Sequence, residues 1–444
     1  MKTFFLMMAL SIAFSPSLVA QKKAKKAKKG AVKTVKYRRS SLHTLLIGTD
    51  DFPRKETVIK AYNEAPFPDK YNNHTISEKL FNPNDYTVTE ADREAAGLKK
   101  DSKLGALAKG AVSTATAGIV DENAADMPII IDKYLKDKKI ANKLVAKWFN
   151  RQEDGSFDMD LIGERGQYNA SEMEANIAKG SARGVTSLKD AGVELINNTF
   201  LVVTKLKFVS NEVVAAAIKE AALIAAGKIA LPPARLAAEK AAEEAYKKGK
   251  EGYSVWTTAY LYQLKWNDEI EATFYNDLWM NSATVDPAKK AAFDNSDLFE
   301  LEFIGEEKAT SLVTFSLKEK RTEEQIVSLA TVRNIDAVYA KLQKKYDVFK
   351  TKTPLATAQP TITALIGKKE GLVGGEQFEV LEQSIDKKTG LTVYKSKGKI
   401  TVEKDKVWDN RHNAGEGGAE TDLKATTFKG GKKYYPGILI RQIK

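Results

Sequence analysis

An adjacent acid and base near the middle of the chain form the first candidate site. Glu164 and Arg165 follow an apolar run at 157–162 and precede a segment that has the features of a helix from Ser171. Sites in α/β folds lie where a strand gives way to a helix, so this pair is a candidate for binding an ionic group. An adjacent acid and base more often form a structural ion pair, and both interpretations stay open.

The second candidate site is the densest group of polar side chains beside an aromatic residue. It comprises Trp408, Asp409, Arg411 and His412. A histidine close to an aspartate has the composition of a general acid–base pair. The sequence shows no nucleophile to accompany this pair, so we interpret the four residues as a binding surface and assign no catalytic residue.

The residue types exclude several common chemistries. The absence of cysteine excludes disulfides, cysteine catalysis, thiolate metal sites and an anchor on a lipid-modified cysteine. The three histidines, His43, His74 and His412, are far apart in the sequence, which argues against a histidine zinc site. The motifs of P-loop enzymes, G-x-S-x-G hydrolases and H-E-x-x-H metalloproteases are absent. We therefore predict neither a metal nor a cofactor.

The positive charge of the chain is concentrated at its N-terminus. The formal net charge is +12, but the first 40 residues hold eleven basic residues and no acid, which leaves +1 for residues 41–444. The folded body is thus nearly neutral, and a broad basic surface for nucleic acid is not supported. We predict no sequence-specific binding of nucleic acid.

Residues 1–20 have the features of a secretory signal peptide. Lys2 supplies the positive charge, the apolar run from Phe4 to Phe14 is too short to span a bilayer, and Ala20 suits the last position before cleavage. Residues 21–41 are predicted to be a disordered basic tail, because like charges repel and bury no core. The sequence therefore predicts an exported protein of the periplasm or the outer membrane. The tail lysines expected to contact an anionic membrane surface are Lys22, Lys23, Lys25, Lys26, Lys28 and Lys29.

The 444 residues are enough for two or three domains, and the first is predicted to be an α/β domain at 42–300. A strand at 157–162, a helix from Ser171 and a strand at 193–208 make a βαβ unit, so the sheet is at least partly parallel. An Ala-rich helical hairpin at 210–252 interrupts this domain. The hairpin either packs against the body or contacts a partner or a membrane.

The C-terminal half of the chain is predicted to end in a separate small domain. Residues 301–350 have the pattern of a β-hairpin with its turn at 306–308, followed by a helix, and residues 351–361 have the composition of a linker. Five short strands within 362–444 indicate a small SH3-like β-barrel or sandwich, of which we predict the barrel. The predicted fold class is therefore α/β, with a mixed sheet, a βαβ unit and an inserted helical hairpin, plus a C-terminal barrel.

An aromatic stripe marks the strand predicted at 255–266. It consists of Trp256, Tyr260, Tyr262 and Trp266, which share one face, and 270–274 is predicted as the returning strand of a hairpin. Such a stripe could stack against sugars or bases, but it is more often the buried side of a sheet. We predict that it is buried.

The stretch 157–208 resembles the core of an envelope α/β domain found in the curli secretion channel protein, the lipoprotein activator of peptidoglycan synthases and the N-terminal part of the Tol system propeller protein. The run at 160–165, which ends in Glu-Arg, and the turn at 190–193 carry the resemblance. Residues 362–444 resemble the small β-domain that closes a periplasmic flagellar assembly protein. The signal and the Lys-rich composition resemble those of Bacteroidota envelope proteins. These resemblances imply binding and assembly rather than catalysis.

Two classes of function remain open. The first is an exported, non-enzymatic assembly or scaffolding protein of the cell envelope, which would bind envelope proteins or peptidoglycan. The alternative is a periplasmic or secreted hydrolase of glycans, for which two carboxylates about 5–9 Å apart across a cleft would be the signature. Homo-oligomerisation is compatible with either class.

Overall fold

The computed structural model describes residues 37–49, 52–97, 124–169, 194–313, 322–386, 392–412, 414, 423–431 and 433–443. The predicted signal peptide and the six tail lysines lie outside these residues. None of the helices that the structure describes is long and apolar enough to cross a membrane.

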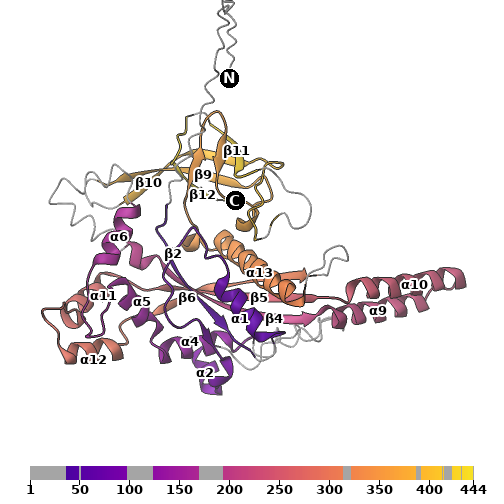
Figure 1. The fold of residues 1–444 in the computed structure, drawn as a ribbon, viewed down its shortest axis with the longest axis horizontal. Coiled ribbons are helices and arrows are strands. Elements are labelled where there is room, and N and C mark those ends of the chain that lie inside the picture. Colours follow the sequence, from indigo (N-terminus) through magenta and orange to yellow (C-terminus); the bar gives the residue numbers. More distant parts are fainter. Residues whose placement is uncertain are drawn as a thin grey trace, which may run out of the picture. The chain divides into compact units, whose positions relative to one another are not determined.

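A mixed sheet forms the centre of the α/β part (Figure 1). Its strands run in the order β2–β1–β4–β5–β6, and β3 also pairs with β1. Strand β1 is parallel to β2, β3 and β4, whereas the pairs β4–β5 and β5–β6 are antiparallel. The strand bounds are Ser41–Ile47 (β1), Asn72–Asn73 (β2), Leu80–Phe81 (β3), Thr199–Ser210 (β4), Tyr253–Leu264 (β5) and Leu301–Val313 (β6).

Helices cover both faces of the sheet, so alternate residues of β1 enter two cores. Leu45 and Ile47 pack with α4 and α5, while Leu42 and Leu46 pack with α1 and α13. A strand buried on both faces carries apolar residues on both, and in β1 these are Leu42 and the run Leu45 to Ile47. The helix bounds are Lys55–Glu64 (α1), Glu90–Ala95 (α2), Met127–Asp137 (α4), Ile140–Trp148 (α5), Asp160–Asn169 (α6), Asp268–Thr273 (α11), Pro287–Asn295 (α12) and Glu323–Lys345 (α13), with short helices at Pro83–Asp85 (η1), Phe274–Leu278 (η3), Asp347–Phe349 (η4) and Lys368–Glu370 (η5).

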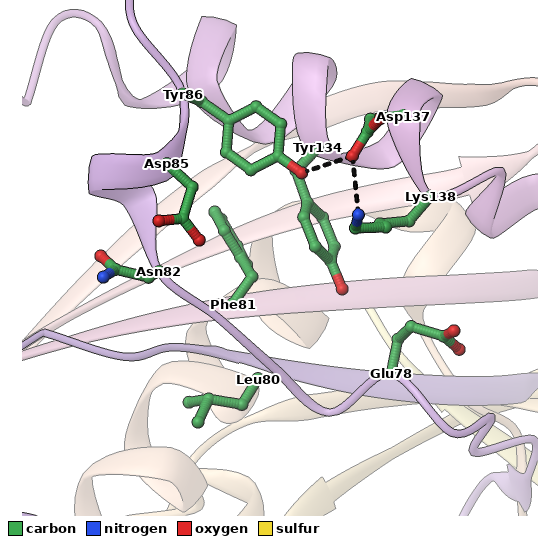
Figure 2. Close-up of a pocket in the computed structure, with 9 residues that line it drawn as sticks. All are labelled: Glu78, Leu80, Phe81, Asn82, Asp85, Tyr86, Tyr134, Asp137 and Lys138. Atoms are coloured by element: carbon green, nitrogen blue, oxygen red, sulfur yellow. Dashed lines mark hydrogen bonds and ion pairs between the residues drawn. The ribbon is translucent and has the colours of Figure 1, made fainter.

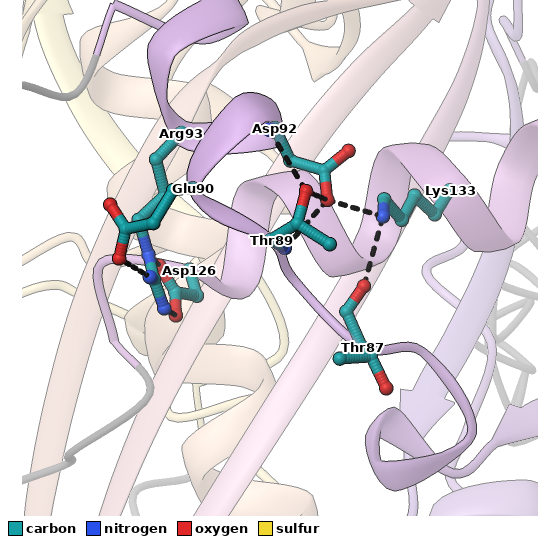
Figure 3. Close-up of polar contacts among 7 residues, drawn as sticks. All are labelled: Thr87, Thr89, Glu90, Asp92, Arg93, Asp126 and Lys133. Atoms are coloured by element: carbon teal, nitrogen blue, oxygen red, sulfur yellow. Dashed lines mark hydrogen bonds and ion pairs between the residues drawn. The ribbon is translucent and has the colours of Figure 1, made fainter.

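A network of ion pairs attaches the short helix α2 to α4 (Figure 3). Arg93 of α2 binds both carboxylate oxygens of Asp126, which precedes α4, with contacts of 2.9 and 2.6 Å. Lys133 of α4 binds Asp92 at 2.6 Å, and Asp92 also forms the capping box of α2 with Thr89. A single turn or two of helix is not stable alone, so these contacts hold α2 in place.

A helical hairpin, called the arm below, joins β4 to β5. It consists of α9 (Asn211–Gly227) and α10 (Pro232–Gly249), which confirms the inserted hairpin predicted from the sequence. Figure 1 shows the two helices side by side, running away from the ends of β4 and β5. At the base, Asn211 donates to the Glu251 carbonyl and accepts from the Ser254 hydroxyl, both at 2.9 Å.

The C-terminal part is a closed antiparallel β-barrel of six strands, in the order β10–β11–β8–β7–β12–β9, which confirms the predicted fold class. The barrel starts at β7, inside the segment predicted as a linker. Thr, Pro and Ala are common in linkers, but Leu355 in this segment is buried in the barrel core. The strand bounds are Thr353–Thr357 (β7), Ile362–Ala364 (β8), Gln377–Ile385 (β9), Thr392–Val402 (β10), Thr426–Gly430 (β11) and Leu439–Gln442 (β12).

The segment 157–162, predicted as a strand, instead leads into helix α6. The Asp158 carboxylate accepts the backbone N–H of Asp160 at 3.0 Å, at the start of this helix. The strand prediction was wrong because the polar residues of the alternating pattern are aspartates, which favour helix N-termini and are depleted in strands. The parallel crossover of the sheet therefore runs from β1 to β4, and β4 begins at Thr199 rather than at 193.

The partner predicted for the aromatic strand is also wrong. Residues 268–273 form α11, whose N-cap Asn267 accepts the N–H of Ile270 at 2.9 Å, and the partner of β5 is β6. Acidic residues in the first turn favour a helix through its dipole. Burial of the stripe is confirmed for Tyr260, Tyr262 and Trp266, while Trp256 is 36% exposed.

Strand β6 replaces the hairpin predicted after Leu301. The polar run at 306–308 is not a turn; it continues β6 along β5. Because β6 ends the strand order of the sheet, one of its edges is free of a sheet partner among the described strands, and charged residues are common on such edges. A bulge near Gly305, whose φ is 153°, accommodates the ring of Tyr346, which a Cβ at this position would overlap.

The last residues of the predicted basic tail belong to the folded body. Arg39 is only 7% exposed and lies 3.7 Å from the Glu194 carboxylate, and Arg38 donates to the Asp69 carbonyl at 2.7 Å. The Tyr37 hydroxyl contacts that of Tyr394 in the barrel. The prediction of a disordered tail is therefore wrong for 37–41, because a buried guanidinium paired with a carboxylate can be part of a core.

Two deletions should separate these parts of the tail. Removal of residues 21–36 is expected to leave the melting temperature unchanged, since like-charged residues supply no core. Removal of residues 21–39 should lower the melting temperature, because it also removes the buried Arg39 side chain and its contact with Glu194. Thermal denaturation of both variants measures the difference. Equal melting temperatures would show that Tyr37 to Arg39 contribute nothing to stability.

Candidate functional site

Arg165 of α6 lies against β1 and the segment that follows β2. Its Nη1 donates to the Ser41 hydroxyl at 3.1 Å and to His74 Nδ1 at 2.9 Å, while Nη2 donates to the Asn73 carbonyl at 2.9 Å. The guanidinium also lies over the Trp148 ring, 4.6 Å from its centre. Arg165 therefore links α6, β1, β2 and α5 through hydrogen bonds and a cation–π contact.

Glu164, the other half of the first candidate site, is exposed. Burial lowers the pKa of Arg165 to about 10, and the negative charge of Glu164 partly offsets this effect. The two side chains thus have different surroundings, and the geometry gives Arg165 a packing role.

His74 is fully buried beside Arg165, and its tautomer follows from its two partners. Its Nε2 lies 2.9 Å from the Leu144 carbonyl, which can only accept, while Nδ1 faces the Arg165 guanidinium, which can only donate. His74 is therefore neutral with its proton on Nε2, and its ring stacks on Trp148 at 4.8 Å. Burial, together with the charge of Arg165, holds the pKa of His74 well below its usual range.

His43 is the second histidine of this region, although the sequence separates it widely from His74. It is fully buried, and burial lowers its pKa to about 4, with further lowering by the charges of Lys147 and Lys79 and partial compensation by Glu78. The sequence did not reveal that His43 and His74 lie close together, because β1 and the segment after β2 become neighbours only in the folded protein. Among the described residues, no group of three His, Asp or Glu side chains could hold a metal ion.

In the second candidate site, which lies on the barrel, two basic side chains bind the carboxylate of Asp409. Both Asp409 oxygens bind the Arg411 guanidinium, at 2.9 and 2.7 Å, and Lys368 adds a contact of 3.2 Å. These hydrogen bonds hold the pKa of Asp409 well below its usual range. The backbone N–H of Trp408 donates to Thr426 at 3.0 Å. Asp409 is thus committed to Arg411 and Lys368, and the contacts shown do not make it the orienting group for His412.

A pocket of about 690 Å³ beside α4 contains the carboxylates Glu78, Asp85 and Asp137 (Figure 2). Asp137 accepts from the Tyr86 hydroxyl at 2.8 Å and pairs with Lys138 at 3.0 Å. Sequence reasoning missed this pocket because its acids come from a loop, a short 3-10 helix and the end of α4.

Two of the three acids of this pocket, Asp137 and Glu78, lack the raised pKa that a glycosidase needs in its general acid. The bonds from Lys138 and Tyr86 lower the pKa of Asp137. Burial alone would raise the pKa of Glu78, but its bonds with Lys143 and Ser77 outweigh that effect and lower it. A glycosidase needs one carboxylic acid whose pKa is raised enough to protonate the leaving group. Neither Asp137 nor Glu78 meets this requirement.

The arm carries an unusual share of the exposed apolar surface. Among the described residues, fourteen large hydrophobic side chains are exposed, and seven of these lie on the arm. Small residues form its buried positions, so the larger apolar residues face outward. The seven residues, with their exposed fractions, are Val213 (57%), Ile218 (55%), Leu223 (37%), Ile224 (61%), Ile229 (37%), Leu231 (70%) and Leu236 (67%).

Four of the seven lie at the far end of the arm, which we call the tip: Ile224, Ile229, Leu231 and Leu236. Lys228 and Arg235 are the only charged residues within 221–238, and Arg235 forms an ion pair of 2.8 Å with Glu239 of α10. The tip is therefore an apolar surface with few charges.

The motif that suggested an envelope α/β domain has a different structure here. Its Glu-Arg pair lies within helix α6 instead of following a strand. The resemblance to that family therefore stays a prediction. No protein-family model matches the chain, and a search of the curated proteins finds no match.

Proposed function

We propose that the protein is an exported, non-enzymatic assembly or scaffolding protein of the cell envelope, and that it binds a partner protein through the tip of the arm. The exposed apolar tip is the observation that carries the proposal. Exposed apolar clusters on soluble surfaces mark interaction sites. Export rests on the signal peptide predicted from residues 1–20.

Burial of the tip would supply part of the free energy of specific binding. Burial of one Leu or Ile side chain contributes about 1.5–3 kcal/mol. Several such side chains offset the loss of translational and rotational freedom on association, which costs at least about 4 kcal/mol, in part or in full. Leu231 and Leu236, the two most exposed of the seven apolar residues, are the expected anchors of the interface.

The apolar residues of the tip indicate the chemistry of the partner. Lys228 and Arg235 lie among them, and Arg235 is paired with Glu239 at 2.8 Å. The complementary surface is therefore an apolar groove. We therefore expect a protein that receives a helical tip, in the manner of other grooves that bind amphipathic helices.

Site-specific photo-crosslinking tests this proposal in the cells that make the protein. A benzoyl-phenylalanine at Leu231 should give one discrete protein adduct, and the adduct should disappear when Ile224→Glu is added. The same probe at Val373, which is 78% exposed on the barrel, serves as the control and should give no such adduct. Adducts with lipid alone, or the same adducts from both positions, would contradict the proposal.

Substitution of the sequence-derived site residues gives a second expected result. Glu164→Gln and His412→Ala should leave the melting temperature and any envelope phenotype nearly unchanged, because surface substitutions usually alter stability by less than about 0.5 kcal/mol. Thermal denaturation and a growth assay under envelope stress measure both properties. A folded variant without function would favour the hydrolase alternative over the scaffold.

A further inference from the structure

A second pocket, of about 560 Å³, lies at the edge of β1 between the stretches that pair with β2 and β3. It is bounded by the segment after α1, the connection between β2 and β3, and helices α5 and α13. Phe67, Ile76 and Ile335 supply apolar walls, and Asn63, Asn73 and Ser77 supply polar ones. The volume is in the range that holds a small organic ligand.

The pocket opens onto a gap in the edge pairing of β1. Strand β2 pairs with Ser41 and Leu42, and β3 pairs with Leu46 and Ile47. The Leu42 carbonyl accepts from His74, and the Leu46 N–H donates to Lys79, so both face the edge that β2 and β3 occupy. Thr44 lies between them with the same orientation, since alternate residues of a strand direct their N–H and C=O groups to the same side. Thr44 lines the pocket.

Two buried tyrosines, Tyr62 and Tyr339, form part of the pocket wall, and they are only 7% and 5% exposed. Both hydroxyl oxygens are enclosed by protein atoms, and that of Tyr62 has the hydroxyls of Thr44 and Thr204 as neighbours. These oxygens therefore belong to the core rather than to the groups that a ligand in the pocket can reach.

The charges at the pocket are positive. Lys79 and Lys147 line it, and none of its lining residues is acidic. Burial lowers the pKa of Lys147, and the charges of Arg165 and Lys79 lower it further. Lys147 donates one hydrogen bond to the Thr75 carbonyl, which leaves two of its three N–H donors for a ligand. The acidic pocket of Figure 2 has the opposite charge and serves as an internal comparison.

We propose that this pocket binds the carboxylate of a peptide C-terminus. Lys79 and Lys147, which line the pocket, neutralise the carboxylate. The backbone of Thr44 pairs with the last peptide group, as a strand edge does with an added chain. The apolar walls receive a small side chain. The source of the peptide is either a protein C-terminus or a stem peptide of peptidoglycan, which share this chemistry.

Isothermal titration of the full chain tests the proposal with N-acetyl-L-Ala-L-Ala, its D-Ala-D-Ala counterpart, the C-terminal amides of both, and inorganic phosphate. At least one acid should bind saturably, its amide at least tenfold more weakly, and phosphate more weakly than the acid. A preference for the L or the D peptide identifies a protein or a peptidoglycan source. The absence of saturable binding by either acid, equal binding of acid and amide, or tighter binding of phosphate would overturn the proposal.

Matched variants locate the binding. Lys79→Met and Lys147→Met should each weaken the acid at least tenfold, whereas Lys138→Met, in the acidic pocket, should leave its affinity unchanged. Unchanged affinity in both pocket lysine variants, or an equal loss in Lys138→Met, would overturn the assignment.

Discussion

Trp148→Ala is expected to destabilise the α/β part by about 3–5 kcal/mol, a large share of a typical stability of about 5–15 kcal/mol. The indole is fully buried, and its Nε1 donates to the Thr199 hydroxyl at 2.8 Å. Its ring packs against both His74 and Arg165, so truncation leaves a cavity beside a buried cation. The lost packing and the poorly solvated guanidinium act in the same direction.

Urea denaturation of Trp148→Ala measures this effect, and the chain offers a matched control. Trp256 is 36% exposed on β5, so Trp256→Ala should cost much less. Each midpoint, with the slope of the transition, gives the free energy of unfolding. A similar loss in both variants would contradict a structural role for the cluster of Trp148, His74 and Arg165.

Acidification from pH 6.5 to 5 is expected to lower the free energy of unfolding. Burial lowers the pKa of His43 to about 4 and that of His74 well below 6.5, so both stay neutral in the folded protein. The unfolded chain takes up protons on both below about pH 6.5, and each extra proton changes stability by about 1.4 kcal/mol per pH unit. Stability is therefore fully present above that pH and declines below it.

One buried carboxyl acts in the opposite direction. Burial raises the pKa of Asp336 from 3.8 to about 6, so below pH 6 the folded state binds the extra proton and gains stability. Between pH 6 and 5, the two histidines hold protons only in the unfolded chain, and Asp336 holds one only in the folded protein. The unfolded chain thus binds about one more proton, and the free energy of unfolding falls by about 1.4 kcal/mol per pH unit. Asp336→Asn should make the decline steeper, and His74→Gln should make it shallower. Urea denaturation across this range measures the slopes, and a free energy of unfolding independent of pH would contradict the burial of neutral histidines.

The elements with a strong period or clear end signals could be predicted from the sequence. The aromatic strand became β5, the Ala-rich hairpin became the arm, and α13 begins with a capping box in which Thr322 and Gln325 bind each other's backbone. These signals are local, so tertiary contacts were not needed to read them.

The failed predictions depend on contacts between distant segments. Residues 306–308 look like a turn, and only the pairing with β5 makes them part of a strand. Leu355 lies in a segment of linker composition, and only the barrel core shows it to be structural. Helix α6 could have been found, because aspartates at 158 and 160 are a helix-start signal that outweighs a short alternation.

The candidate sites were harder to predict than the fold. Asp409 and Arg411 were predicted as part of a binding surface, and in the structure they hydrogen-bond one another. The buried histidines and the pocket with Tyr62 and Tyr339 depend on the meeting of β1, the segment after β2 and α13. No local pattern encodes that meeting, since each segment alone resembles an ordinary strand, loop or helix.

The affinity between the full chain and the protein captured at Leu231 tests the central claim most directly. Leu231→Glu with Leu236→Glu should weaken this affinity at least tenfold, or about 1.4 kcal/mol, because both side chains would leave an apolar interface. The melting temperature should not change, since both residues are about two-thirds exposed in the free protein. Val373→Glu, on the barrel, should have no effect on either property. Equal affinity of the double variant and the unmodified chain would contradict a scaffold that acts through the tip of the arm.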